Sequence, residues 1–313
     1  MARINHRGVN NLSIRQDTNT LTVTNEVSLW QTLTNLFKLR IVSLLLFAAV
    51  GGAFLGAAGR PGLLDMLVLL VTGGLSAAGA SALNQYIERD SDGDMKRTRQ
   101  RPLVTGHIQH PEYVLWIALA MILLPVAAVW PFNPELGFFL LLGAMIYVGV
   151  YTIWLKPRTM LNIVIGGAAG SCAVLSGGAA VGAWNDPGVL ALAAIVFLWT
   201  PTHFWALAIL YRDDYIASNT PMLPAQTSAR TSAIWGFVHA IGLAILAIAL
   251  GADSALGLLY FVPAALMTLY FLMHSLRLIF VPTRKQALKL FLTSNLYLAV
   301  IILFVCISSV AGY

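Results

Sequence analysis

Nine apolar runs, each close to twenty residues long, determine the environment in which this 313-residue chain can fold. Hydrophobic residues make up 58% of the sequence and charged residues 10%, against about 25% charged in a soluble protein. About 20 apolar residues can cross the hydrocarbon core as a helix, which satisfies its own backbone hydrogen bonds there. The sequence therefore predicts an all-α polytopic membrane protein with nine transmembrane helices, at 41–58, 63–87, 113–131, 135–155, 161–182, 188–211, 233–251, 255–277 and 289–311.

Basic residues are distributed unequally between the two sets of segments that nine spans create. Of the 19 lysines and arginines, only Arg60 falls on one side. The positive-inside rule then places the N-terminus in the cytoplasm and the C-terminus outside. This asymmetry accounts for the net charge of +6, so a nucleic-acid partner is not expected. The basic side comprises the N-terminal segment and the loops near 88–112, 156–160, 212–232 and 277–289.

The chain begins with a polar stretch that has no apolar signal-peptide region. Residues 1–30 are rich in Asn, Thr, Ser and Arg, and we expect them to form a disordered cytoplasmic tail. Residues 31–313 are expected to form a single intramembrane domain of nine helices.

Three oxygen-bearing side chains stand four residues apart where the second span meets water. Asn84, Glu88 and Asp92 share one face of a helix, because a helix turns about 100° per residue. Carboxylate and amide oxygens suit a hard cation such as Mg²⁺. The basic residues that follow, Lys96, Arg97, Arg99 and Arg101, suit phosphate. The stretch predicts a site for a metal-bound diphosphate at the membrane margin.

A second acidic pair, Asp213 and Asp214, follows the sixth span directly after Arg212. It leaves the membrane on the same predicted side as the first cluster, so both could reach one diphosphate. Carboxylates gathered in this way repel one another unless cations neutralise them, and we expect two Mg²⁺ ions. The alternative is that these residues are ordinary charged loop ends.

The motifs resemble those of UbiA-type intramembrane prenyltransferases, and more narrowly of the heme O synthase (protoheme IX farnesyltransferase) branch. The resemblance rests on N-Q-Y-I-E-R-D-S-D at 84–92, M-K-R-T-R-Q-R-P-L at 95–103, H-F-W-A-L-A-I-L-Y-R-D-D-Y at 203–215 and P-M-L-P at 221–224. Two departures are Glu88, where the wider superfamily usually has Asp, and Leu210, where it has an earlier Asp.

The resemblance implies a farnesyl diphosphate donor, a heme B acceptor and Mg²⁺ as cofactor, with Asn84, Glu88, Asp92, Asp213 and Asp214 as metal ligands. It implies that the enzyme lies in a bacterial cytoplasmic (inner) membrane with its active site toward the cytoplasm. A heme A synthase or cytochrome oxidase assembly factors are candidate partners that receive the product. The candidate diphosphate-binding residues are Lys96, Arg97, Arg101 and Arg212, with Lys38, Arg40, Lys156 and Arg158 as weaker ones.

His203 is the candidate heme-binding residue. It lies 11 residues before Asp214, so a continuous helix would turn both side chains the same way. An intramembrane histidine is a functional candidate by default. It could ligate heme iron, hydrogen-bond a propionate, or serve packing through an interhelical hydrogen bond.

Two other functions compete with this interpretation. A UbiA-type prenyltransferase with a quinone-precursor or chlorin acceptor would carry similar acidic clusters. A secondary transporter would place its acidic residues near the membrane midplane, whereas here they lie at the margin.

Overall fold

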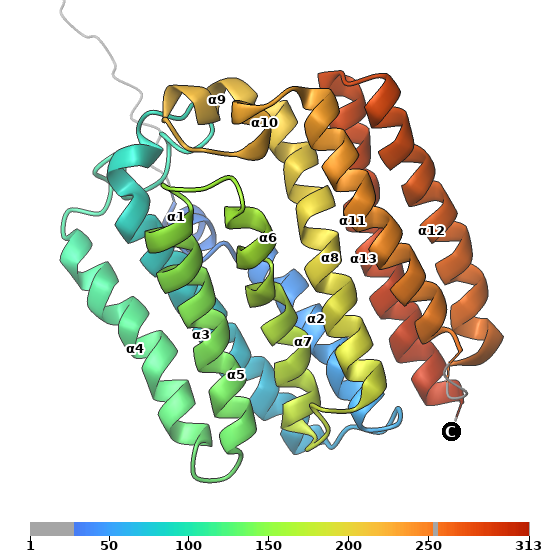
Figure 1. Ribbon diagram of the computed structural model, residues 1–313. Coiled ribbons are helices and arrows are strands. Elements are labelled where there is room, and N and C mark those ends of the chain that lie inside the picture. Colours follow the sequence, from blue (N-terminus) through green and yellow to red (C-terminus); the bar gives the residue numbers. More distant parts are fainter. Residues whose placement is uncertain (1–27, 253–255, 313) are drawn as a thin grey trace, which may run out of the picture.

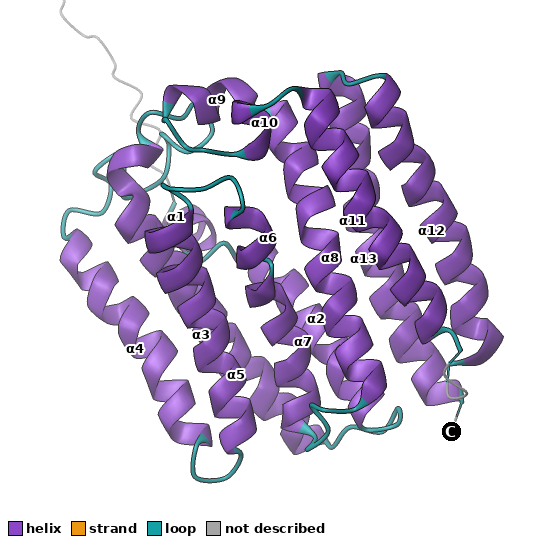
Figure 2. Ribbon diagram, in the orientation of Figure 1, coloured by secondary structure: helices purple, strands orange, loops and turns teal. Residues whose placement is uncertain are grey.

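Every regular element in the part of the chain that the structure describes is helical (Figures 1 and 2). This structure is a computed structural model that describes residues 28–252 and 256–312. Nine of its helical segments are long and apolar enough to cross a membrane, which confirms the nine predicted spans. These segments are α2 (Leu39–Gly56), α3 (Leu63–Asp92), α4 (Pro111–Val129), α5 with η1 (Pro134–Ala144 and Met145–Leu155), α6 with α7 (Asn162–Gly166 and Ala168–Ala180), α8 (Pro187–Leu210), α11 (Ala229–Leu250), α12 (Gly257–Phe280) and α13 (Arg284–Ala311).

Successive spans run in opposite directions, so the connecting segments gather at the two ends of the bundle (Figure 1). Two short helices, α9 (Arg212–Ala217) and α10 (Leu223–Gln226), lie across one end, at the top of Figure 1. We call this the α9 end; segments 93–110 and 156–161 lie there too. The loop that carries Arg60 lies at the opposite end, as the charge pattern predicts.

Proline begins three of the spans, at Pro111, Pro134 and Pro187, where the missing N–H has no helical partner to lose. Helix α3 continues to Asp92, beyond the apolar run predicted to end at 87. Its 30 residues measure about 45 Å, more than the roughly 30 Å hydrocarbon core. The last turns of α3 therefore lie at the α9 end, where polar side chains can be accommodated.

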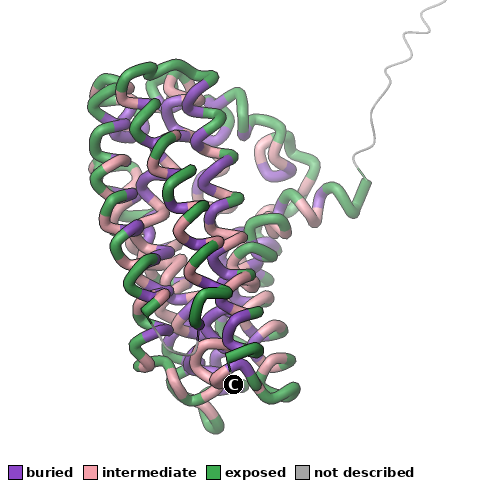
Figure 3. The backbone as a smooth tube through the Cα atoms, turned by 90° about the vertical axis from the view of Figure 1, so that its right-hand side faces the viewer, coloured by how far each residue is buried: buried purple, intermediate pink, exposed green. Residues whose placement is uncertain are grey.

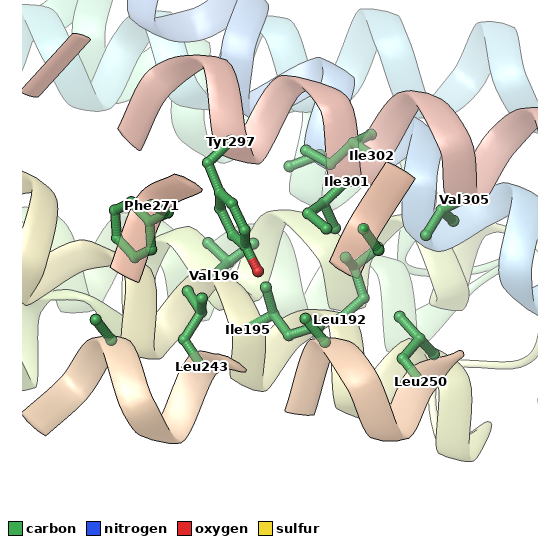
Figure 4. Close-up of a cluster of buried hydrophobic side chains, with 14 of the residues drawn as sticks. Leu192, Ile195, Val196, Leu243, Leu250, Phe271, Tyr297, Ile301, Ile302 and Val305 are labelled. Carbon is green, nitrogen blue, oxygen red and sulfur yellow. The ribbon is translucent and has the colours of Figure 1, made fainter. Parts of the chain in front are cut away.

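Helix α8 lies at the centre of the largest apolar cluster and packs against α7, α11 and α13. Leu192, Ile195 and Val196 of α8 face Leu243 and Leu250 of α11 and the inner face of α13 (Figure 4). Exposed residues recur along the outside of the helices (Figure 3), and many of them are large and hydrophobic, as expected of spans that meet lipid.

Helices α2 and α7 cross with their backbones in close contact. A Cβ built at Gly177 would lie 1.8 Å from the carbonyl oxygen of Ala49, and one at Gly52 would lie 2.1 Å from that of Val174. Small residues are therefore required at this crossing, as is common between membrane helices.

Two features differ from the sequence prediction. Helix α1 (Leu29–Leu36) precedes the first span and begins inside the stretch predicted as a tail, because Ser28 and Gln31 form a capping box. The rest of the predicted tail, residues 1–27, lies outside the described residues. The second feature is η1, an 11-residue π-helix within the fourth span. Hydropathy cannot distinguish π from α winding, because an apolar run satisfies the membrane equally well in either winding.

Candidate active site

Asn84, Glu88 and Asp92 form a buried row along the last turns of α3. Their exposed fractions are 2%, 8% and 1%, although all three are polar or charged. The row exists because α3 remains α-helical through Asp92, which keeps residues four apart on one face. Buried carboxylates are retained only where cations or donors balance them.

Lys38 forms a hydrogen bond with Asn84, the first residue of the row. Its Nζ donates to Asn84 Oδ1 at 2.7 Å and to the Tyr147 hydroxyl at 3.1 Å. The Asn84 amide donates in turn to Thr152 Oγ1 at 3.0 Å. Lys38 separates α1 from α2 and adopts a left-handed backbone conformation with φ +48°. Burial, together with the positive charge of Arg101, lowers the pKa of Lys38 to about 7.

The two carboxylates of the row face one cation each. Lys156 Nζ donates to Glu88 Oε1 at 2.5 Å, and the Arg101 guanidinium is ion-paired with Asp92. The three basic residues come from the residue before α2, from the segment after α3 and from the residue after η1, so distant parts of the sequence converge here. Without a ligand, Lys156 and Arg101 neutralise the two carboxylates of the row. With a diphosphate bound, the same groups could contact phosphate oxygens.

The second acidic pair divides its contacts. Asp214 is half-buried, and its Oδ2 accepts from the backbone N–H of Arg97 at 3.3 Å, which joins α9 to the segment after α3. Asp213 is exposed and ion-paired with Arg284 at the start of α13, at 2.5 Å. Asp214 therefore contacts the segment that follows the row, whereas Asp213 contacts the first residue of α13.

Of the predicted basic residues, Lys38, Lys156 and Arg101 contact the row, and the rest make other contacts. The guanidinium of Arg97 lies 5.6 Å from the centre of the Tyr211 ring and 3.5 Å from the Tyr215 hydroxyl. Arg212 Nε donates to the Pro224 carbonyl at 2.7 Å, an interaction that fixes α10 beneath α9. Arg158 binds backbone carbonyls of η1, and Lys96 and Arg40 are exposed.

The donor set fits Mg²⁺, whose preferred ligands are oxygens. Asn84, Glu88 and Asp92 supply buried oxygen atoms that already face positive charge. Among the described residues, however, no three His, Cys, Asp or Glu side chains converge closely enough to hold a metal by themselves. A metal at this row would therefore need further oxygens, as Mg²⁺ does when it binds water and substrate phosphate.

His203 lies within α8 between two aromatic rings. Its ring stacks on Trp199 at 4.1 Å and on Phe291 at 4.7 Å, and its Nδ1 lies 2.7 Å from Ser294 Oγ. Ser294 Oγ also lies 2.7 Å from the Phe291 carbonyl, which can accept its proton. In that arrangement the neutral ring donates from Nδ1 to Ser294 Oγ and carries a lone pair on Nε2.

The continuous helix that would have aligned His203 with Asp214 is not present. Helix α8 ends at Leu210, Tyr211 leaves the helical conformation at φ −109° and ψ 30°, and α9 begins at Arg212 and turns across the bundle (Figure 1). No glycine or proline marks this break in the sequence, so periodicity alone missed it.

Several contributors to the site were missed by reasoning from the sequence. Tyr147 and Thr152 contact Lys38 and Asn84, and Ser294 contacts the His203 ring. Each is an ordinary residue of an apolar span, and no local signal distinguishes it. An intramembrane hydroxyl opposite a charged or histidine-bearing helix is the only pattern that could have pointed to these residues.

Comparison with known proteins supports the same family. The UbiA prenyltransferase family profile matches residues 44–306. A protein from Saccharolobus islandicus named protoheme IX farnesyltransferase is 39% identical over 274 residues, which cover 86% of this chain and 94% of that protein. A protein of the same name from Thermus thermophilus is 40% identical over 273 residues, covering 87% of this chain and 45% of that longer protein.

Solved structures share the fold at low sequence identity. A digeranylgeranylglyceryl phosphate synthase structure has a TM-score of 0.76 at 14% identity, covering 90% of this chain and 99% of that one. A UbiA homolog from Archaeoglobus fulgidus, bound to DMAPP and Mg²⁺, has a TM-score of 0.62 at 14% identity with the same coverage. Taken with the extent of the family profile, these matches show that the chain belongs to the UbiA prenyltransferase family and is a membrane-embedded prenyltransferase.

Proposed function

We propose that this enzyme transfers the farnesyl group of farnesyl diphosphate to a vinyl group of heme B, forming heme O. The relatives named protoheme IX farnesyltransferase support the donor and the acceptor. The observation that carries the chemistry is the buried row Asn84, Glu88 and Asp92, with a cation on each member. Such a row can take a metal-bound diphosphate, because its cations and oxygens can exchange partners without creating unpaired buried charge.

The donor's diphosphate would lie between the α3 row and Asp214. Lys38, Lys156 and Arg101 are the basic residues best placed to contact it, since each already lies against the row. Mg²⁺, of which we propose two ions held by Asn84, Glu88, Asp92 and Asp214, would neutralise charge on the leaving diphosphate when bound. A structure of a UbiA homolog bound to DMAPP and Mg²⁺ supports a prenyl diphosphate and Mg²⁺ as ligands of this fold.

The chain's own residues favour ionisation of the allylic C–O bond. As the bond lengthens, both electrons move onto the diphosphate oxygen, and fixed ammonium and guanidinium groups stabilise the growing negative charge. The allylic cation left behind would lie among apolar helices, where little water can capture it. A vinyl carbon–carbon double bond of the acceptor then attacks the cation, forming the new carbon–carbon bond and leaving a cation on the former vinyl group. Water adds to that cation and releases one proton to solvent, which gives the hydroxyethylfarnesyl group.

His203 is the proposed contact for the acceptor. With the Nδ1 proton donated to Ser294, Nε2 would carry the lone pair that a heme iron requires. A propionate would instead require a donor at Nε2, which this tautomer lacks. The stacked rings of Trp199 and Phe291 fix the plane of the imidazole.

His203→Ala is expected to weaken heme B binding by about tenfold and to change the optical spectrum of the bound heme, because one axial ligand is lost. The matched control is His239→Ala, another histidine in a span, whose Nδ1 lies 2.8 Å from the carbonyl of Trp235 in the same helix. Titration of purified protein with heme B, followed by absorbance, measures both effects. An unchanged spectrum in His203→Ala contradicts iron ligation.

The charge pattern supports an orientation with the α9 end toward the cytoplasm of a bacterial inner membrane. Both substrates would then reach the site from the cytoplasmic side or from the bilayer. The product would pass to a heme A synthase or to cytochrome oxidase assembly, which are the proposed partners.

Acceptor choice is tested by incubating membranes that contain the enzyme with labelled farnesyl diphosphate, Mg²⁺ and one acceptor at a time. We expect label in a farnesylated heme with heme B, and none with a quinone precursor or a chlorin. Label in either of those products instead identifies the enzyme as a prenyltransferase for that acceptor. Cation-dependent flux without any product would indicate transport.

A further inference from the structure

The π-helix η1 and the residue that follows it carry four side chains that lie at the active site. Tyr147 and Thr152 contact Lys38 and Asn84, and Lys156, which directly follows η1, contacts Glu88. The ring of Tyr151 stacks on that of Tyr147 at 5.9 Å, with 10° between the planes. Most π-helices are single turns, and they are frequent at functional sites. An 11-residue π-helix facing the acidic row is therefore unusual.

The winding of η1 decides which way Lys156 points. Tyr147 and Lys156 are nine residues apart. Nine residues make two and a half turns of an α-helix, with 3.6 residues per turn, so α winding would place the two side chains on opposite faces. A π-helix has about 4.4 residues per turn, which makes the same nine residues about two full turns. Only the wider winding turns both side chains toward α3.

The side chain of Arg158 holds the end of this helix. The Lys156 N–H donates to the Tyr151 carbonyl, five residues back, at 2.8 Å. After it, Pro157 has no N–H, and the N–H groups of Arg158 and Thr159 both donate to Leu155. The carbonyls of Ile153 and Trp154 instead accept from Arg158 Nη1, at 2.8 and 2.9 Å. A cation at a helix C-terminus also interacts favourably with the helix dipole.

We propose that Arg158 is a positioning residue: by binding the last carbonyls of η1 it maintains the π winding that aims Lys156 at Glu88. This replaces the sequence-based interpretation of Arg158 as a direct diphosphate ligand. The inference deepens the proposed function, since it assumes that Lys156 contacts the donor's diphosphate. It does not depend on which acceptor the enzyme uses.

The test is a double-mutant cycle on donor binding, measured with purified full-length protein, Mg²⁺ and labelled farnesyl diphosphate, with inorganic diphosphate as a second probe. Acceptor is omitted, so failure to farnesylate heme B leaves the test intact. We expect Lys156→Gln to raise the Kd about tenfold and Arg158→Gln to raise it by a similar factor, because each variant removes the same contact, that between Lys156 and the diphosphate. The double variant should lie within about twofold of Lys156→Gln alone.

Two further variants separate positioning from general damage. Arg158→Lys keeps a cation that can reach the same carbonyls, so its Kd should return to within about threefold of the wild type, and it remains informative where Arg158→Gln folds poorly. Arg230→Gln removes an exposed arginine of α11 at the α9 end, away from the row, and should bind like the wild type. The proposal would be overturned if the increase in Kd of the double variant equalled the product of the two single increases. It would also be overturned if Arg158→Gln bound the donor with the wild-type Kd.

Discussion

Asp92→Asn is expected to lower kcat/KM for prenyl transfer by about 10³-fold. The substitution keeps the shape of the side chain but removes one negative charge from the centre of the site, where Asp92 is 1% exposed. It takes away an oxygen ligand of high charge and leaves Arg101 without its buried ion-pair partner. The pigment extracted from expressing cells gives the readout. We expect farnesylated heme with the wild type and unmodified heme B with Asp92→Asn or Asp92→Ala.

Asp90→Asn is the matched control for this variant. Asp90 lies two residues away on the same helix, but its side chain is 89% exposed and 3.7 Å from Arg89. Removal of its charge should leave activity within about twofold of the wild type, since exposed ion pairs contribute little. Thermal unfolding of both variants separates lost chemistry from lost folding. Equal farnesylation by Asp92→Asn and the wild type would contradict the assignment of Asp92 to the active site.

The two aspartates of the second motif are expected to differ in importance. Asp214→Asn should lower kcat/KM about 10²-fold. Asp214 is half-buried, and its carboxylate accepts a hydrogen bond from the backbone N–H of Arg97, in the segment that follows the α3 row. Asp213→Asn should cost less than about fivefold, because an exposed pair such as Asp213–Arg284 is worth about 0–1 kcal/mol. Steady-state kinetics with farnesyl diphosphate as the varied substrate measures both.

The order of these effects matters more than their size. If Asp213→Asn were the more damaging variant, the exposed aspartate would bind the metal and α9 would have to rotate on ligand binding. Arg284→Gln serves as the matched variant for Asp213, because it breaks the same ion pair from the other side. Similar small losses of kcat/KM in Asp213→Asn and Arg284→Gln would agree with an ion pair that only stabilises the position of α9.

Local periodicity was enough to predict the spans and the α3 row. Apolar runs of the right length specify membrane helices, and i, i+4 spacing keeps Asn84, Glu88 and Asp92 on one face for as long as the helix continues. Helix α3 does continue, to Asp92. The same reasoning failed at Tyr211, where the helix breaks without a proline or glycine.

Tertiary contacts explain what the sequence could not provide. Lys38 and Lys156 ranked below Lys96, Arg97 and Arg212 as candidate ligands, because they lie far from the acidic motifs along the chain. The structure nevertheless places Lys38 and Lys156 directly on the row. Lys38 reaches it from a left-handed turn and Lys156 from a π-helix, and neither conformation has a hydropathy signature.

The central claim is that the α3 row and Asp214 bind one metal-bridged diphosphate. Mn²⁺, soaked with an unreactive farnesyl diphosphate analogue into crystals of the wild-type protein, can be located by anomalous scattering. We expect peaks within about 2.0–2.6 Å of carboxylate oxygens from both Asp92 and Asp214, with the diphosphate between them. Metal confined to one acidic patch, or a diphosphate bound away from both, would contradict the account.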